Sequence, residues 1–150
     1  MTPYQMVRER YSFPFELRPY QIDSVDNKLC PYRRAGLYDE PGTGKTATAT
    51  FFSLYWHMME GTAPYIVLLP PILLTQWERW LASIKDLKTG KPLTSAMYAG
   101  TPAQRKKVDL NRDYILTTYG LLKNDYEYLY DRLNPLNYGV LADEAHVIKN

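Results

Sequence analysis

The sequence predicts an α/β fold in which a mostly parallel sheet is covered by helices on both faces. Apolar runs of strand length alternate along the chain with longer segments whose apolar residues recur every three or four positions. Two polar motifs, GTGKT at residues 42–46 and DEAH at residues 143–146, each follow closely on a predicted strand. Because ligands of parallel sheets bind outside the carboxyl ends of the strands, both motifs are expected at a binding site.

Length and composition favour one soluble domain. The chain has 150 residues, of which 45% are hydrophobic, and this is enough to bury one core. A net charge of +2 permits a nucleic-acid partner without requiring one. The single cysteine, Cys30, forms no internal disulfide or metal cluster and is best interpreted as an ordinary thiol. Without a leader pattern or a membrane-length apolar run, an intracellular protein, cytoplasmic or nuclear, with no membrane partner is expected.

The N-terminal region divides into an arm and the start of the domain. Residues 1–14 are polar and interrupted by prolines, so we expect a surface arm, with the domain over residues 15–150. A helix is predicted from Pro19, where proline suits the first turn. Its apolar face is formed by Leu17, Ile22, Val25 and Leu29. Gln21 carries an amide that can read N6 and N7 of adenine, although an exposed glutamine at a helix start is the alternative.

The GTGKT motif has the chemistry of a phosphate-binding loop. Gly42 and Gly44 lack Cβ atoms, so the backbone can curl and direct successive N–H groups at one anion. Lys45 adds a charge for the β- and γ-phosphates of ATP, and the Thr46 hydroxyl can ligate Mg²⁺. A strict phosphate loop has glycine at the position of Asp39, so the match is partial. An ordinary turn that caps a helix is the alternative.

The remaining elements follow from hydrophobic periodicity. Helices are predicted over residues 46–60, 72–87, 103–110 and 119–132, and strands over residues 36–38, 65–69, 93–98, 113–117 and 138–142. The helix at 103–110 is basic. Its residues Arg105, Lys106 and Lys107 could meet phosphates, but a solvated run of charge is the preferred interpretation.

The DEAH motif places two adjacent carboxylates directly after a buried strand. Such a pair is costly there unless a cation or a water network satisfies it. Asp143 can hold Mg²⁺, and Glu144 can polarise the water that attacks the γ-phosphate. Two acids that cap a following helix are the alternative, but GTGKT upstream in the same alternating pattern favours a site for ATP and Mg²⁺.

Six segments together resemble a known family. They are LRPYQ, DEPGTGKT, IVLLPPILLTQW, YAG, ILTTYG and VLADEAHVIKN, in that order after Phe15. They resemble the first RecA-like lobe of superfamily-two helicases, and most closely that of the Swi/Snf-type DNA translocases and chromatin remodellers. Many helicases share the phosphate loop and DEAH, whereas LRPYQ, DExGxGKT and DEAHxIKN together are more specific to the Swi/Snf group. The resemblance implies a RecA-like P-loop NTPase lobe, apparently truncated after the DEAH motif.

The resemblance also implies a role for each matching residue. The catalytic residues would be Lys45, Asp143 and Glu144, with Mg²⁺ held by Thr46 and Asp143. The nucleotide would be bound by Arg18, Gln21, Pro41, Gly42, Thr43, Gly44, Lys45 and Thr46. Nucleic-acid backbone contacts would come from Pro70, Thr75, Gln76, Thr117, Thr118 and Tyr119. His146 would couple the nucleotide site to the nucleic acid. Pro41 and Thr43 depart from the usual Met and Leu of the family.

These roles imply a nucleic-acid-dependent ATPase that couples ATP hydrolysis to translocation, rather than strand separation, on duplex DNA. A non-catalytic nucleotide-binding regulatory module and another P-loop phosphotransferase are the alternatives. The sequence stops shortly after DEAH, so the second lobe and its arginine finger are expected to be missing from it. This chain alone is therefore expected to be nearly inactive, since an arginine finger contributes roughly 10³ to 10⁵ in rate.

Overall fold

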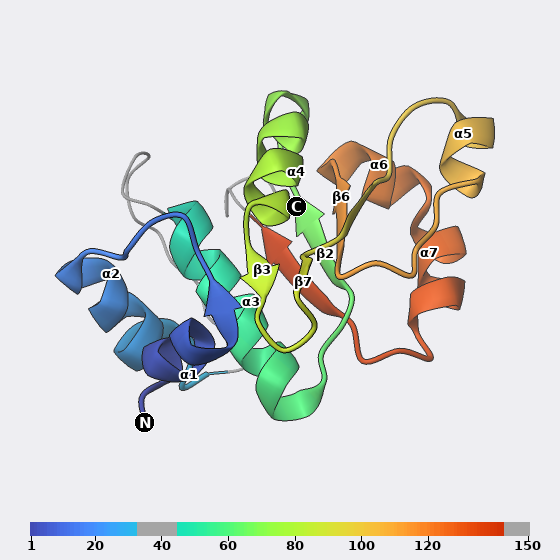
Figure 1. The fold of residues 1–150 in the computed structure, drawn as a ribbon. Helices are drawn as coiled ribbons and strands as arrows, with labels where there is room; N and C mark the ends of the chain where they lie inside the picture. Colours follow the sequence, from blue (N-terminus) through green and yellow to red (C-terminus); the bar gives the residue numbers. More distant parts are fainter. Residues whose placement is uncertain (33–44, 143–150) are drawn as a thin grey trace.

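A parallel sheet forms the centre of the domain (Figure 1). The structure is a computed structural model that describes residues 1–32 and 45–142. Within these ranges the sheet has four strands in the order β5-β6-β2-β7. The strands are β2 (Tyr65–Leu68), β5 (Ser95–Met97), β6 (Tyr114–Thr117) and β7 (Gly139–Ala142). Leu68 pairs in register with both Thr117 and Ala142, so these three strands end at one common edge.

Helices cover both faces of this sheet. In Figure 1, α1, α2 and α3 lie on one side, and α5, α6 and α7 lie on the other. The α-helices are α1 (Pro3–Arg10), α2 (Pro19–Asp23), α3 (Lys45–Glu60), α4 (Leu74–Ala82), α5 (Pro102–Lys106), α6 (Tyr119–Asn124) and α7 (Tyr126–Leu133). A π-helix at Ser24–Leu29 continues α2, and a 3₁₀ turn at Pro71–Leu73 precedes α4. The α/β class with a parallel sheet covered on both faces is confirmed.

The side chains of β2 show why the central strands have sequences that are apolar at every position. Tyr65 and Val67 pack into the cluster that contains α3 and α4 residues. Ile66 and Leu68 pack into a second cluster with residues of α7. Since alternate side chains of a strand point to opposite faces, a strand covered on both faces must be apolar at every position. All four residues of β2 are buried.

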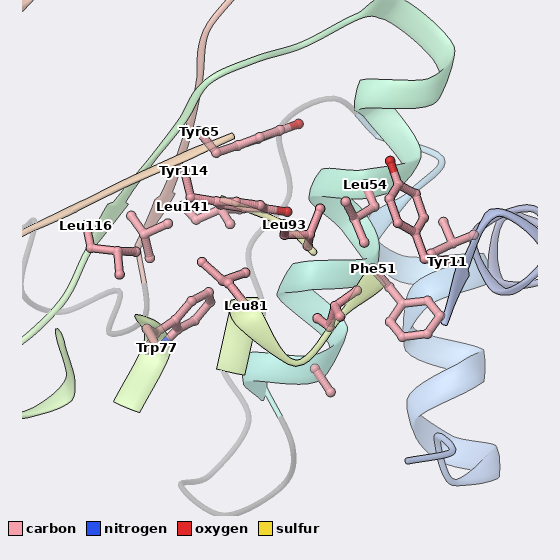
Figure 2. Packing of buried hydrophobic residues seen from close by; sticks show 14 of the residues in the cluster. Tyr11, Phe51, Leu54, Tyr65, Trp77, Leu81, Leu93, Tyr114, Leu116 and Leu141 are labelled. Atoms are coloured by element: carbon pink, nitrogen blue, oxygen red, sulfur yellow. The ribbon is translucent and has the colours of Figure 1, made fainter. Parts of the chain in front are cut away.

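Two tyrosines anchor α3 to the sheet. Tyr65 and Tyr114, on neighbouring strands, stack with ring centroids 6.1 Å apart (Figure 2). The Tyr114 hydroxyl and Ser53 Oγ of α3 share a buried hydrogen bond of 2.6 Å. Trp80 Nε1 of α4 donates to Thr50 Oγ1 of α3 at 2.9 Å. These contacts fix α3, and therefore the residues that begin it, relative to the strands.

The N-terminal segment is not the surface arm that its polarity predicted. Val7 of α1 has none of its surface exposed, and Tyr11 has 2%. The Tyr4 ring stacks on Phe51 with centroids 5.4 Å apart, and the Thr2 side chain caps the helix. One apolar residue and a few aromatic rings are enough to bury one face of a short helix, because each aromatic ring removes a large area from water. One face of the segment packs on the core through Val7 and Tyr11, whereas Thr2, Gln5 and Glu9 stay exposed.

Other differences concern element boundaries. The helix predicted over 72–87 ends at Ala82, because residues 85–86 form β3 (Lys85–Asp86). β3 lies between β1 (Tyr11–Ser12) and β4 (Lys91–Pro92) in a small antiparallel sheet. The helix predicted over 119–132 is divided at Asp125, and the helix predicted over 103–110 is shorter. The strand predicted over 36–38 lies outside the described residues.

The burial of the Cys30 thiol and the Tyr11 phenol predicts a loss of stability at alkaline pH. Burial raises the pKa of the Cys30 thiol from 9.0 to about 12, and the pKa of Tyr11 from 10.0 to about 12. A raised folded-state pKa gives stability that is complete below the unfolded pKa and is lost as the pH rises through the folded pKa. We therefore expect the free energy of unfolding, measured by urea titration, to fall between pH 9 and 12. Cys30→Ala should flatten the first part of this decline, and an unchanged slope would contradict the assignment to Cys30.

Candidate functional site

The start of α3 lies at the edge of the sheet where the strands end. Ser53, in the middle of α3, meets Tyr114, the first residue of β6. The chain leaves α3 at Glu60 and enters β2 at Tyr65, so the C-terminal end of α3 lies near the amino ends of the strands. The start of α3, at Lys45, therefore lies toward the opposite, carboxyl edge, as the course of α3 beside the strands shows (Figure 1).

The side chains that open α3 have the chemistry for a phosphate and a metal ion. Lys45 and Thr46 are both half-buried. The backbone of this first turn is reinforced by two hydroxyls, since Thr48 Oγ1 donates to Lys45 O at 3.1 Å and Thr50 Oγ1 donates to Thr46 O at 2.7 Å. The first N–H groups of an α-helix have no partner within the helix, so a helix start attracts anions.

The strand that precedes the acidic motif in the sequence, β7, ends at the same edge. Asp143 follows directly on Ala142, the residue of β7 that pairs in register with Leu68. The predicted residues that lie outside the described ranges are Pro41, Gly42, Thr43, Gly44, Asp143, Glu144 and His146. Their roles stay predictions. What the structure contributes is the position of the two elements, α3 and β7, from which the motifs extend.

Gln21 is held in place by its own helix. Only 8% of the residue is exposed, so the alternative of an exposed glutamine at a helix start does not apply. Its Oε1 accepts a hydrogen bond of 2.7 Å from the backbone N–H of Arg18, which lies just before α2. This bond fixes the orientation of the amide. Adenine recognition by Gln21 and Arg18 stays a prediction.

The residues predicted to contact nucleic acid differ in accessibility. Thr75 and Gln76 are exposed on the first turn of α4, and Pro70 is half-buried just before it. Thr118 and Tyr119 are half-buried at the start of α6, where Thr118 Oγ1 accepts from Leu121 N at 3.2 Å.

Thr117 requires a correction. It is completely buried, and its hydroxyl donates to Tyr98 O at 2.9 Å inside the protein. As the last residue of a strand between two others, it points into the covered face of the sheet. Its hydroxyl therefore joins two strand ends and does not face a nucleic acid. For this segment, Thr118 and Tyr119 stay the predicted contacts.

Arg105 was expected in a solvated run of charge, and this expectation is wrong. Only 8% of the residue is exposed, and its guanidinium is paired with Asp125 at 2.7 Å. Lys106 and Lys107, by contrast, are exposed as expected. The sequence carries no local signal for the pairing, because Asp125 lies 20 positions further along the chain.

A cavity of about 280 Å³ lies away from this candidate site. Its lining includes Tyr65 and Tyr114, the first residues of β2 and β6, together with His57 near the end of α3. It therefore opens at the amino edge of the sheet, opposite to Lys45. Among residues 1–32 and 45–142, no group of three or more metal-binding side chains could hold a metal ion, and no helix could span a membrane.

These observations define the class of the protein as a parallel α/β domain with its candidate site at the carboxyl edge of the sheet. The sequence of residues 20–150 matches the SNF2-related domain family. The match covers most of the chain, and the chain belongs to this family. This agrees with the resemblance carried by its motifs.

Similar proteins are considerably longer than this chain. Chicken chromodomain-helicase-DNA-binding protein 1 is 28% identical over 152 residues, which cover 90% of this chain and 8% of that protein. A human SWI/SNF-related matrix-associated actin-dependent regulator of chromatin, subfamily A containing DEAD/H box 1, is 31% identical over 151 residues, which cover 89% of this chain and 14% of that protein.

A solved structure supports the fold. The Sulfolobus solfataricus SWI2/SNF2 ATPase core, determined in complex with dsDNA, matches with a TM-score of 0.58 and 22% sequence identity. The match covers 89% of this chain and 33% of that chain. At this level of identity the similarity demonstrates a shared fold, and the RecA-like architecture implied by the motifs is confirmed.

Proposed function

We propose that this chain is the ATP-binding lobe of a nucleic-acid-dependent ATPase that couples ATP hydrolysis to translocation on duplex DNA. One observation carries the proposal: the start of α3, with Lys45 and Thr46, and the end of β7, which leads to Asp143, lie at the same edge of the sheet. Family membership over residues 20–150 supports it. An intracellular location and a second RecA-like lobe as partner remain predictions from the sequence.

ATP would bind across the first turn of α3. Gly42 and Gly44 would supply backbone N–H groups to the phosphates, and Lys45 would bind the β- and γ-phosphates. Gln21, whose amide is fixed by Arg18, would read the adenine. The fit is supported by the anchored position of α3 and the burial of Gln21.

Mg²⁺ fits the donor set at this edge. The Thr46 hydroxyl and the Asp143 carboxylate are hard oxygen ligands, which this ion prefers. When bound, the ion would neutralise the phosphate charge that develops during hydrolysis. Glu144, the next residue, would orient and polarise the attacking water, while Lys45 stabilises the phosphate charge.

Duplex DNA would bind along the same edge. Thr75 and Gln76 are exposed at the start of α4, and Thr118 and Tyr119 lie at the start of α6. Hydroxyl, amide and main-chain groups of this kind contact phosphates and sugars, which fixes orientation without reading sequence. Binding would therefore be largely independent of DNA sequence.

Phosphate release tests the proposal when it is measured on the full-length protein, meaning this lobe together with the second lobe that the proposal requires. ATP turnover is expected to rise on addition of duplex DNA and to rise less with single-stranded DNA or RNA. A non-catalytic module would bind ATP without release under any condition. A phosphotransferase would require an acceptor substrate and would not respond to DNA. Either result would replace the proposed function.

Removing the exposed polar groups of α4 should weaken the response to DNA. In Thr75→Ala/Gln76→Ala, the DNA concentration for half-maximal stimulation is expected to rise about fivefold to thirtyfold, because each lost hydrogen bond costs on the order of 1 kcal/mol and one or two are lost. The KM for ATP should not change. Thr89→Ala, an exposed threonine between β3 and β4, is the matched control. If the two variants had the same half-saturating DNA concentration, α4 would not be part of the DNA site.

A further inference from the structure

An ion pair between the buried Arg105 and the half-buried Asp125 joins α5 to the junction of α6 and α7. Arg105 Nε donates to Asp125 Oδ2 at 2.7 Å, and Nη2 donates to Oδ1 at 3.3 Å. The hydroxyl of Tyr98 donates to the same Asp125 Oδ2 at 2.7 Å. The side chain of Asp125 makes no capping bond to α7, although the residue stands directly before that helix. Its carboxylate is therefore used for Arg105 and Tyr98.

The same arginine also holds the loop that follows β5. Arg105 Nη1 donates to Gly100 O at 2.6 Å. Gly100 has φ +97°, a backbone conformation that favours glycine, and a Cβ there would also meet the Gln104 side chain. At the other end of this loop, Tyr98 O accepts the buried hydroxyl of Thr117. The loop is thus fixed to both α5 and the end of β6.

These contacts bring two segments of the carboxyl edge together. β5 and β6 are parallel neighbours, so the loop 98–100 and the turn 117–119 leave the sheet side by side. The helices α5, α6 and α7 that follow them lie together on one side of the sheet (Figure 1). The turn contains Thr118 and Tyr119, both placed in the proposed DNA site.

The pair carries its full charge at neutral pH. The hydrogen bond from Arg105 holds the pKa of Asp125 below its usual value, and burial raises the pKa of Tyr98, so its phenol stays a donor. Side-chain exposures are 9% for Arg105 and 20% for Asp125. A charge-assisted, two-pronged contact of this kind is rigid, and removing one partner leaves the other charge poorly compensated.

We propose that Arg105 and Asp125 are positioning residues for DNA engagement: they hold the loop 98–100 and the start of α6 in the arrangement that binds the DNA backbone. The inference rests on the proposed function. Neither residue needs to touch DNA, since both act through Gly100, Tyr98 and the α6–α7 junction. Loss of the pair should therefore change DNA engagement and leave ATP binding as it was.

The chain contains a matched ion pair for control. Arg10 Nη2 and Nε donate to Asp86 Oδ2 and Oδ1 at 3.1 and 3.3 Å, also as a two-pronged contact. Exposures of 26% and 14% make this pair similarly enclosed. It joins α1 to β3, in the small sheet beside the cavity at the amino edge. A purely structural effect of losing an ion pair should appear equally in both places.

The experiment compares Asp125→Asn with Asp86→Asn in the full-length protein. For Asp125→Asn we expect about a tenfold higher duplex DNA concentration at half-maximal stimulation of ATP turnover, with DNA-free turnover and the KM for ATP unchanged. Asp86→Asn should lower the melting temperature comparably and leave the DNA response unchanged. Tyr98→Phe removes one hydroxyl from the cluster and should shift the half-saturating DNA concentration about twofold to threefold. Tyr98→Phe tests the same inference if Asp125→Asn does not fold.

Distinct outcomes separate this inference from the proposed function. If wild-type turnover does not respond to DNA, the proposed function is overturned and this inference with it. If the wild type responds, and Tyr98→Phe or Asp125→Asn has the DNA response of the wild type, only the inference is overturned. An equal shift in Asp86→Asn also overturns it, because the effect would then follow stability and not position.

Discussion

Replacing Lys45 by alanine in the full-length protein is expected to weaken ATP binding about a hundredfold. The loss corresponds to one charge-assisted interaction with phosphate, on the order of 3 kcal/mol. The fold should survive the change. Lys45 is half-buried at the first position of α3, and that helix is fixed further along by Ser53 and Thr50. Isothermal titration calorimetry with ATP and Mg²⁺ measures the effect.

Lys28→Ala is a suitable control for this measurement. Lys28 is an exposed lysine in the last turn of the π-helix and has no place in the proposed site. It should bind ATP like the wild type. Equal affinity of the wild type and Lys45→Ala would place the phosphates elsewhere and remove the phosphate-loop assignment.

Elements with a strong local signal were predicted well. The helix expected over 46–60 is α3, and the strands expected over 65–69, 113–117 and 138–142 are β2, β6 and β7 within one or two residues. In each case the apolar pattern agrees with what the tertiary structure requires. The parallel arrangement followed from the alternation of strand and helix.

Features that depend on distant partners were not predictable from local patterns. Val7 is buried because α1 packs on α3, and this contact joins segments about 40 residues apart. The local sequence predicts that Arg105 is a surface charge, because its partner Asp125 is close only in the folded chain. The local sequence predicts that the Thr117 hydroxyl is accessible, but the order of the strands buries it between β5 and β2. A charge or hydroxyl has the same local pattern whether its partner is water or protein.

The candidate site was predictable at the level of its motifs. A glycine-rich turn and an acidic pair after predicted strands imply a shared edge, and the register of Leu68 with Ala142 agrees with this for β2 and β7. The positioning contacts of Gln21 with Arg18, and of Arg105 with Gly100, needed the fold. Motifs identify groups that meet a ligand, whereas the groups that hold them in place have no required sequence pattern.

Glu144→Gln is expected to separate ATP binding from turnover in the full-length protein. Glutamine has nearly the same shape as glutamate but cannot accept a proton at neutral pH. General-base catalysis contributes about 10² to 10⁴ in rate, so phosphate release should fall by that factor. ATP affinity, measured by calorimetry, should stay within about twofold, since the predicted phosphate ligands are unchanged. Glu127→Gln, an exposed residue on the first turn of α7, is the matched control.

The pattern of loss identifies the kind of protein. If Glu144 activates the water, its variant keeps ATP affinity and loses both basal and DNA-stimulated turnover, whereas Asp125→Asn keeps basal turnover and needs more DNA for half-maximal stimulation. A non-catalytic module would show ATP binding without turnover in every variant and in the wild type. Normal phosphate release by Glu144→Gln would assign water activation to another residue, and Asp143 would then be the first to test. Binding and turnover must therefore be measured on the same preparations, because either quantity alone fits more than one of these mechanisms.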